Sequence, residues 1–223
     1  MAHMESTWTE VDTYFAERLA PNDAALEAAL ADSESAGLPA ISVTSTQGKF
    51  LQLLVRIGNA RRILEIGTLG GYSTIWMARA LPPGGKIVTL EIDPKHAEVA
   101  RHNIERAGQR SVVEIRVAPA AESLAQMKQE GVDPFDFVFI DADKASTAEY
   151  YDASVELSRA GTLIVIDNVA REGRVIDADT DDESIRGIRR GVDRITNDPR
   201  VSATAIQTVS SKGYDGFILA VVL

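Results

Sequence analysis

From residue 62 onward, short runs of β-branched and aliphatic residues alternate with longer segments of helical period. This alternation is typical of a parallel sheet whose strands are joined by crossover helices. Two of the runs, 137–140 and 163–166, are apolar throughout, as expected for central strands that helices cover on both faces. The predicted strands are 62–67, 86–92, 112–118, 135–141, 162–167, 202–209 and 216–222.

The last two predicted strands are separated only by residues 210–215, which are too few for a crossover helix. We therefore predict that they pair as an antiparallel hairpin. The expected fold class is α/β and Rossmann-like: a seven-stranded, mostly parallel sheet with one antiparallel strand and helices on both faces.

Before residue 60 the sequence has helical period, with predicted helices at 9–19, 23–35 and 46–57. Proline and glycine residues separate these segments. Three short helices cannot form an independent core, so we expect residues 1–60 to cover a cleft of the main domain, residues 61–223.

Composition excludes several classes of partner and cofactor. The chain has 23 basic and 33 acidic side chains, a net charge of −10. It therefore lacks the basic surface that nucleic-acid binding requires. No apolar run is long enough to span a membrane. There is no cysteine, which excludes disulfides and thiolate chemistry and fits a cytoplasmic location.

Residues 63–73 form a predicted strand that leads through a glycine-rich turn into a helix beginning near Ser73. The glycines let the backbone approach a ligand closely, and the free amides of a helix start favour negative groups. Glu91 closes the next strand, where a carboxylate can accept both hydroxyls of a ribose. Dinucleotide-binding folds share this layout, but the Gly-x-Gly-x-x-Gly fingerprint is absent, because Thr68 and Leu69 follow Gly67.

Glu65 lies two residues before Gly67, inside the end of the first predicted strand. A charge in a buried strand needs a partner. The alternative to a role in ligand binding is that Glu65 caps a neighbouring helix or pairs with an arginine.

Acidic and amide side chains follow two apolar strands. Asp141 ends the fourth predicted strand, and Asp167 with Asn168 ends the fifth. Neighbouring strands lie about 4.8 Å apart, so these oxygens can converge on one ion at the carboxyl edge of the sheet. Such a site suits Mg²⁺, Mn²⁺ or Ca²⁺ and disfavours zinc. The alternative is that Asp141 and Asp167 are loop or helix caps.

Lys144 lies three residues after Asp141. A nearby divalent cation disfavours the charged form of a lysine, which makes the amine usable as a base. The alternative is a salt bridge from Lys144 to Asp143 or Glu149 that only shapes the loop.

These motifs resemble those of the class I methyltransferases that use S-adenosylmethionine (SAM). The segments 64–68 and 71–73 are similar to those of the cation-dependent O-methyltransferases, the group of caffeoyl-CoA and catechol O-methyltransferases. The resemblance extends from about Val43 to the C-terminus and includes residues 47–51, 135–144 and 167–168.

The resemblance implies a SAM- and cation-dependent methyltransferase that acts on a vicinal dihydroxy aromatic small molecule. Lys144 would be the proton acceptor, acting beside Asp141 in the catalytic centre. The implied metal ligands are Asp141, Asp167 and Asn168. The implied donor-binding residues are Val43, Glu65, Gly67, Thr68, Ser73, Glu91, Ala120 and Asp141, with Glu91 on the ribose. Relatives of this kind are commonly homodimers.

Two positions depart from the family pattern: Ala118 replaces a frequent glycine, and Thr147 a frequent tyrosine or asparagine. We expect residues 169–182 and the N-terminal helices to shape the acceptor pocket, although Arg171 could equally anchor its own loop. The acidic run 177–183 is expected to be a solvated loop, with a part in gripping substrate as the alternative.

Two other functions share parts of this pattern. A nicotinamide-dependent, NAD(P)-type oxidoreductase would require the missing dinucleotide fingerprint. A non-catalytic protein that only holds SAM would not need Lys144.

Overall fold

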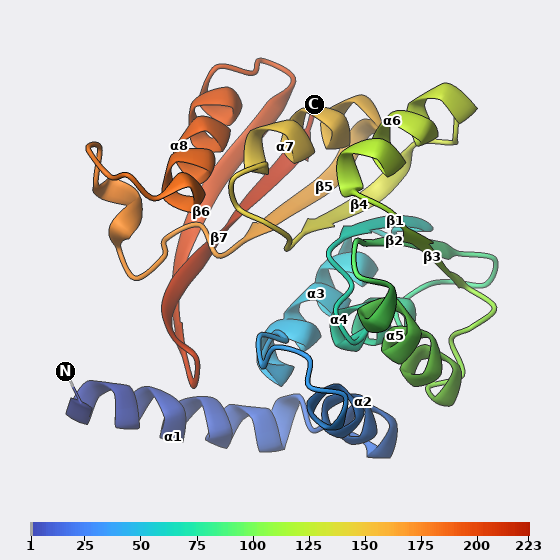
Figure 1. The fold of residues 1–223 in the computed structure, drawn as a ribbon, viewed down its shortest axis with the longest axis vertical. Helices are drawn as coiled ribbons and strands as arrows, with labels where there is room; N and C mark the ends of the chain where they lie inside the picture. Colours follow the sequence, from blue (N-terminus) through green and yellow to red (C-terminus); the bar gives the residue numbers. More distant parts are fainter. Residues whose placement is uncertain (1) are drawn as a thin grey trace.

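The computed structural model describes residues 2–223, with side chains from residue 6 onward. Its centre is a seven-stranded sheet in the order β3-β2-β1-β4-β5-β7-β6 (Figure 1). The strands are β1 Arg62–Ile66, β2 Lys86–Glu91, β3 Val113–Val117, β4 Phe135–Ile140, β5 Ser158–Asp167, β6 Val201–Ser210 and β7 Gly213–Val222.

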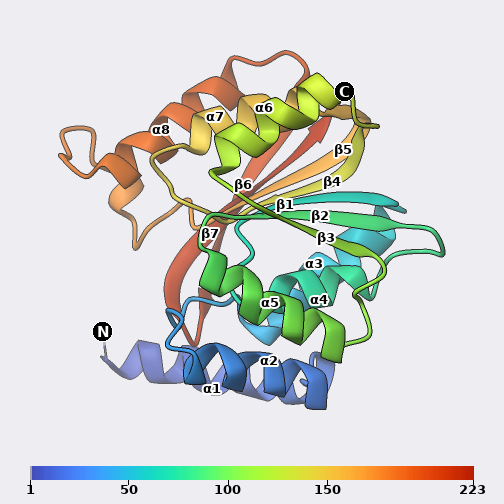
Figure 2. The ribbon, with the colours of Figure 1, turned by 45° about the vertical axis from the view of Figure 1, so that its right-hand side comes forward.

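Helices cover both faces of this sheet, as Figure 2 shows. One layer contains α6 Ala120–Glu130, α7 Thr147–Glu156 and α8 Glu183–Thr196. The opposite layer contains α3 Ser45–Ile57, α4 Tyr72–Ala78 and α5 Pro94–Arg106, with α1 Ala2–Leu19 and α2 Ala24–Ser35 lying outside it.

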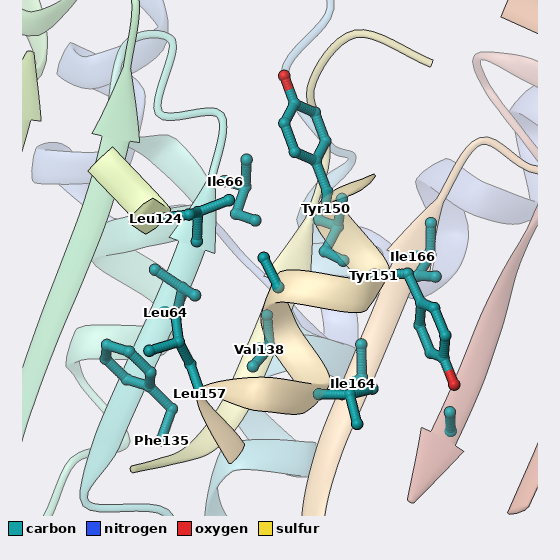
Figure 3. Close-up of a cluster of buried hydrophobic side chains, with 14 of the residues drawn as sticks. Leu64, Ile66, Leu124, Phe135, Val138, Tyr150, Tyr151, Leu157, Ile164 and Ile166 are labelled. Atoms are coloured by element: carbon teal, nitrogen blue, oxygen red, sulfur yellow. The ribbon is translucent and has the colours of Figure 1, made fainter. Parts of the chain in front are cut away.

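The runs 137–140 of β4 and 163–166 of β5 are apolar because their side chains pack into two separate cores on opposite faces of the sheet. In β4, Val138 and Ile140 pack beneath α6 and α7, whereas Phe137 and Phe139 pack against the layer of α3 and α4. The first of these cores contains Tyr151 of α7 as its largest fully buried side chain (Figure 3). Alternate strand residues point to opposite faces, so a strand covered on both faces loses the polar half of its pattern.

The C-terminal hairpin has the predicted antiparallel pairing. Only Ser211 and Lys212 connect β6 to β7, and β7 is antiparallel to both β5 and β6. The seven-stranded, mostly parallel sheet with one antiparallel strand is therefore confirmed.

The strand bounds differ from the prediction at this end of the sheet. The start of β5 is Ser158 and not residue 162, because Ser158 pairs with Phe135 across an irregularity in the ladder. The hairpin strands are longer than predicted, since Gly213 adopts a φ of +96° that allows the chain to reverse at once.

The N-terminal helices share the main core. Leu26 of α2 and Val55 of α3 are buried in the same cluster as Ile63 of β1. Asp12 ties α1 to two other elements: it accepts a hydrogen bond from Thr46 at 2.9 Å and two from Ser211. The division of the chain at residue 60 stays a prediction. None of the helices described between residues 2 and 223 has the length and apolarity needed to cross a membrane.

Candidate active site

The glycine turn after β1 lies against the end of β4. A side chain at Gly67 would place its Cβ 2.0 Å from the carbonyl oxygen of Asp141, and the φ of Gly67 is +102°. Gly71, with φ +81°, precedes the first residue of α4. Only glycine satisfies both requirements at position 67, so the close approach of β1 to β4 explains this residue.

Glu91 is held in a fixed orientation at the end of β2. Its carboxylate accepts hydrogen bonds from the backbone N–H of Leu69 at 2.8 Å and of Asp93 at 3.0 Å. The imidazole Nδ1 of His96 lies 3.6 Å from the same carboxylate. These contacts hold Glu91 in the cavity wall, where its carboxylate can accept hydrogen bonds from the hydroxyl groups of a ligand. His96 was not predicted; its only signal was its place in the first turn of the helix after Glu91.

Glu65 is fully buried and does not line the cavity. It accepts hydrogen bonds from the hydroxyls of Ser73, Thr74 and Thr89 at 2.6, 2.5 and 2.7 Å. It thus contacts the first turn of α4 through side-chain hydroxyls and pairs with no arginine among the residues that the structure describes. Burial is the main cause that raises the pKa of Glu65, to about 7, and the charge of Asp141 adds to the increase.

This raised pKa predicts a pH-dependent stability. Glu65 binds its proton more tightly in the folded chain than in the unfolded chain, so the free energy of unfolding should fall as pH rises from about 4.5 to about 7 and then level off. In Glu65→Gln this contribution, about 3 kcal/mol, should be absent. Urea unfolding at pH 5 and pH 7.5 gives the free energy of unfolding of the wild-type protein and of Glu65→Gln. If this free energy changed with pH by the same amount in both proteins, the prediction would be contradicted.

The structure brings most of the predicted site residues to one cavity of about 860 Å³ at the carboxyl edge of the sheet. Glu65 and Asp167 are the exceptions. The predicted residues that line this cavity are Val43, Gly67, Thr68, Ser73, Glu91, Ala120, Asp141, Lys144 and Asn168.

A second cavity of about 270 Å³ adjoins the first and contains Asp167 in its wall. Val43, Asn168 and Arg171 line both cavities. The larger cavity faces the glycine turn and the smaller one faces the β6–β7 hairpin, so the predicted oxygen cluster lies between them.

Asp141 and Asp167 follow directly paired strand residues, because Ile140 of β4 pairs with Ile166 of β5. Asp167 is only 4% exposed and accepts hydrogen bonds from the backbone N–H of Asn168 at 2.8 Å and the amide of Gln47 at 2.5 Å. Burial and the charge of Asp141 raise the pKa of Asp167 to about 6. Gln47 lay in a segment that carried the resemblance, but no role was predicted for it.

These residues fit a hard divalent cation. A buried carboxylate beside a second carboxylate is unfavourable without a compensating positive charge. Among the side chains described, those of residues 6–223, no group of three histidine, cysteine or acidic side chains is placed to hold a metal. A cation here would therefore depend on two carboxylates and the Asn168 amide, which are the oxygen ligands that Mg²⁺, Mn²⁺ or Ca²⁺ accept.

Lys144 donates a hydrogen bond to Asp141 at 2.8 Å, and its side chain is 11% exposed. Asp143, one of the two alternative partners, instead accepts hydrogen bonds from Ser146 and from the Tyr150 hydroxyl. The amine of Lys144 is thus directed toward the oxygen cluster. Tyr150 was not predicted, although it also lines the larger cavity.

The two departures from the family pattern have different structural consequences. Ala118 lines the larger cavity beside Glu91 and donates a backbone hydrogen bond to the carbonyl of that residue. Thr147 is buried and donates its hydroxyl to the carbonyl of Lys144 at 2.7 Å. Thr147 therefore holds the loop that carries Lys144 and does not line either cavity.

The acidic run 177–183 is largely solvated, as predicted. Asp177, Asp179, Asp181 and Glu183 are exposed, and Asp182 caps the start of α8 through the N–H of Ser184. No residue of this run lines either cavity.

A Rossmann-like sheet with a glycine turn after β1, an acid at the end of β2 and a ligand cavity at the carboxyl edge is the architecture of class I methyltransferases, which they share with dinucleotide-binding folds. A family model described as "O-methyltransferase" matches residues 21–221. The chain belongs to this O-methyltransferase family and is a SAM-dependent enzyme.

Several relatives match over nearly the whole chain. A catechol O-methyltransferase of Niastella koreensis is 51% identical over 212 residues, which cover 95% of this chain and 96% of the relative. A catechol O-methyltransferase of Mycobacterium tuberculosis is 50% identical, with 96% and 95% covered. The crystal structure of an O-methyltransferase from Bacillus cereus in complex with SAH is 57% identical, with a TM-score of 0.97 and 99% and 100% covered.

Membership of this family excludes the two alternative functions that the sequence left open. A SAM-dependent O-methyltransferase is an enzyme, so the non-catalytic SAM-binding protein is set aside. The nicotinamide oxidoreductase is set aside because the chain belongs to a family that transfers methyl groups.

Proposed function

We propose that this enzyme transfers the methyl group of SAM to one hydroxyl of a catechol-type small molecule in a reaction that depends on a divalent cation. The observation that carries the proposal is the buried Asp167 beside Asp141, between the two cavities. The names of the relatives from Niastella koreensis and Mycobacterium tuberculosis support a catechol as acceptor.

Each part of the larger cavity has a role in this reaction. Glu91 binds the ribose hydroxyls of the donor, and the turn at Gly67 and Thr68 lets the donor approach the backbone. Ser73 lies in the wall, and Glu65 fixes its hydroxyl from behind. Val43 and Ala120 complete the donor-binding wall.

The acceptor is bound and deprotonated at the oxygen cluster of Asp141, Asp167 and Asn168. Asp141, Asp167 and Asn168 would hold the cation, which supplies electrostatic stabilisation of a phenolate when bound. Lys144 accepts the phenol proton at its Nζ. The acceptor oxygen then attacks the sulfonium methyl, the methyl–sulfur bond breaks and S-adenosylhomocysteine is the leaving group; the close alignment that the two cavities impose is the main help to this step.

Turnover of catechol with and without EDTA tests the proposal. We expect EDTA to lower turnover by roughly a hundredfold or more and Mg²⁺ in excess to restore it, because the cation stabilises the phenolate. Calorimetric titration with SAM in EDTA should still show donor binding, since Glu91 and the glycine turn need no metal. Full turnover in EDTA would overturn cation dependence and leave methyl transfer intact.

Two expectations from the sequence stay predictions. The homodimer implied by the resemblance would be checked by light scattering of the purified chain, and a monomer at assay concentration would contradict it. The cytoplasmic location likewise stays a prediction.

A further inference from the structure

Arg171 occupies the boundary between the two cavities. It lies in the loop after β5 and lines both the larger and the smaller cavity. Within the part of the chain that the structure describes, the guanidinium of Arg171 makes no hydrogen bond or ion pair. A half-buried cation that lines two cavities and has no partner among the described residues is available to bind an anionic group.

The other cations of the smaller cavity are already engaged. Lys212 donates hydrogen bonds to the carbonyl oxygens of Ile41 at 2.9 Å and Ser42 at 2.6 Å. Arg174 pairs with Asp182 at 2.5 Å. Of the cations that line this cavity, Arg171 alone therefore keeps its charge free among the described residues.

The loop around Arg171 is held by another residue. Asp215 of β7 accepts hydrogen bonds from the backbone N–H groups of Ala170, Arg171 and Gly216, each at 2.9 Å. Asp215 therefore anchors this loop, and the Arg171 guanidinium is not required for that purpose.

Holding the loop in this shape is costly. Arg171 and Glu172 have positive φ values of 50° and 57°, and Gly173 follows with 83°. Two consecutive non-glycine residues in the left-handed region are uncommon and persist only where surrounding contacts enforce them. The backbone of the segment that places Arg171 at the boundary between the two cavities is therefore strained.

We propose that Arg171 binds a carboxylate on the aromatic ring of the acceptor and thereby selects catechol carboxylic acids. A guanidinium can form two parallel hydrogen bonds to a carboxylate. This inference rests on the proposed function, because it assumes that the ring hydroxyls lie at the oxygen cluster.

The same contact would determine which hydroxyl is methylated. The two vicinal hydroxyls of the acceptor, bound at Asp167 and Asn168, exchange positions when the aromatic ring binds in the flipped orientation. A carboxylate held by Arg171 adds a second fixed point, so one orientation is favoured over the other. Loss of Arg171 should therefore change both the preference for the acid and the ratio of the two methylated products.

The test compares Arg171→Gln with the wild-type enzyme on two acceptors, with SAM and Mg²⁺ present. The acceptors are 3,4-dihydroxybenzoate and the neutral 3,4-dihydroxybenzyl alcohol, which has similar size. We expect kcat/KM of the variant to fall roughly 10- to 100-fold for the acid, the effect of losing charge-assisted hydrogen bonds. It should stay within about twofold for the alcohol. The ratio of 3-O- to 4-O-methylated acid should move toward one.

Arg186→Gln is the matched control, because Arg186 is an exposed arginine paired with Asp181 and Glu183 outside both cavities. It should leave both acceptors unaffected. Equal losses for both acceptors, or an unchanged preference for the acid, would overturn the inference. A weaker Kd for SAM in Arg171→Gln would assign the arginine to the donor's own carboxylate and also overturn it. If the wild-type enzyme methylated catechol but neither of these acceptors, the inference alone would fall. If it methylated none of the three, the proposed function would fall as well.

Discussion

Replacement of Lys144 by alanine should lower turnover of catechol by roughly 10²- to 10⁴-fold, the usual contribution of a positioned base. The affinity for SAM should be unchanged, because Glu91 and the glycine turn bind the donor without Lys144. The reason for the loss is that Nζ of Lys144 lies at the oxygen cluster, 2.8 Å from Asp141. Single-turnover kinetics and calorimetry with SAM measure the two effects separately.

A second substitution distinguishes proton transfer from charge. Lys144→Arg keeps a positive charge beside Asp141, but a guanidinium cannot release its proton in a protein. If Lys144 acts as the base, the arginine variant should be about as impaired as the alanine variant. Wild-type turnover in Lys144→Ala would remove the lysine from its assigned role. Recovery in Lys144→Arg alone would reduce its role to one of charge.

Replacement of Asp167 by asparagine should abolish the response to Mg²⁺ and lower turnover by roughly a hundredfold or more. Asparagine keeps the size of the side chain and can still accept the hydrogen bond from the N–H of Asn168, so the loop should remain in place. The charge needed to bind a divalent cation is lost. Turnover measured across a range of Mg²⁺ concentrations gives this result directly.

The same variant should be more stable than the wild-type protein when no metal is bound. Burial and the charge of Asp141 both oppose ionisation of Asp167, so the neutral asparagine removes a cost on the order of 3 kcal/mol at pH 8. Urea unfolding in EDTA measures the difference. A less stable variant would mean that the lost turnover reflects a damaged fold and not a missing ligand.

Asp93→Asn is the control for Asp167→Asn. Asp93 also follows a strand at the carboxyl edge, but its carboxylate caps α5 through the N–H of Lys95. This control should keep the Mg²⁺ response. An Asp167→Asn enzyme that reached full turnover at the wild-type Mg²⁺ concentration would refute the ligand assignment.

The architecture could be predicted because its signals are local. The runs 137–140 and 163–166 are apolar over consecutive residues, and the segment between residues 210 and 215 is visibly too short for a helix. The exact bounds of β5 and β6 were harder to predict. β6 carries mostly exposed side chains, and the start of β5 depends on pairing between Ser158 and Phe135, which are distant in sequence.

The candidate site could be predicted in part for the same reason. Asp141 and Asp167 each end an apolar run, so their placement at one edge follows from the parallel sheet. Gln47 and Asp215 could not be assigned from local pattern. Gln47 reaches Asp167 across 120 residues of sequence, and Asp215 holds a loop more than 40 residues away.

By itself the sequence determined the order of strands and helices, the glycine turn and the acids that follow the strands, since each depends on neighbouring residues. The tertiary structure decided that Glu65 is buried and accepts a hydrogen bond from Ser73, and that Lys144 donates a hydrogen bond to Asp141. It also decided that the Arg171 guanidinium has no partner among the described residues. These properties depend on which side chains from distant segments compete for the same space and the same hydrogen-bonding groups. Such competition is settled only when the sheet and its helices pack together.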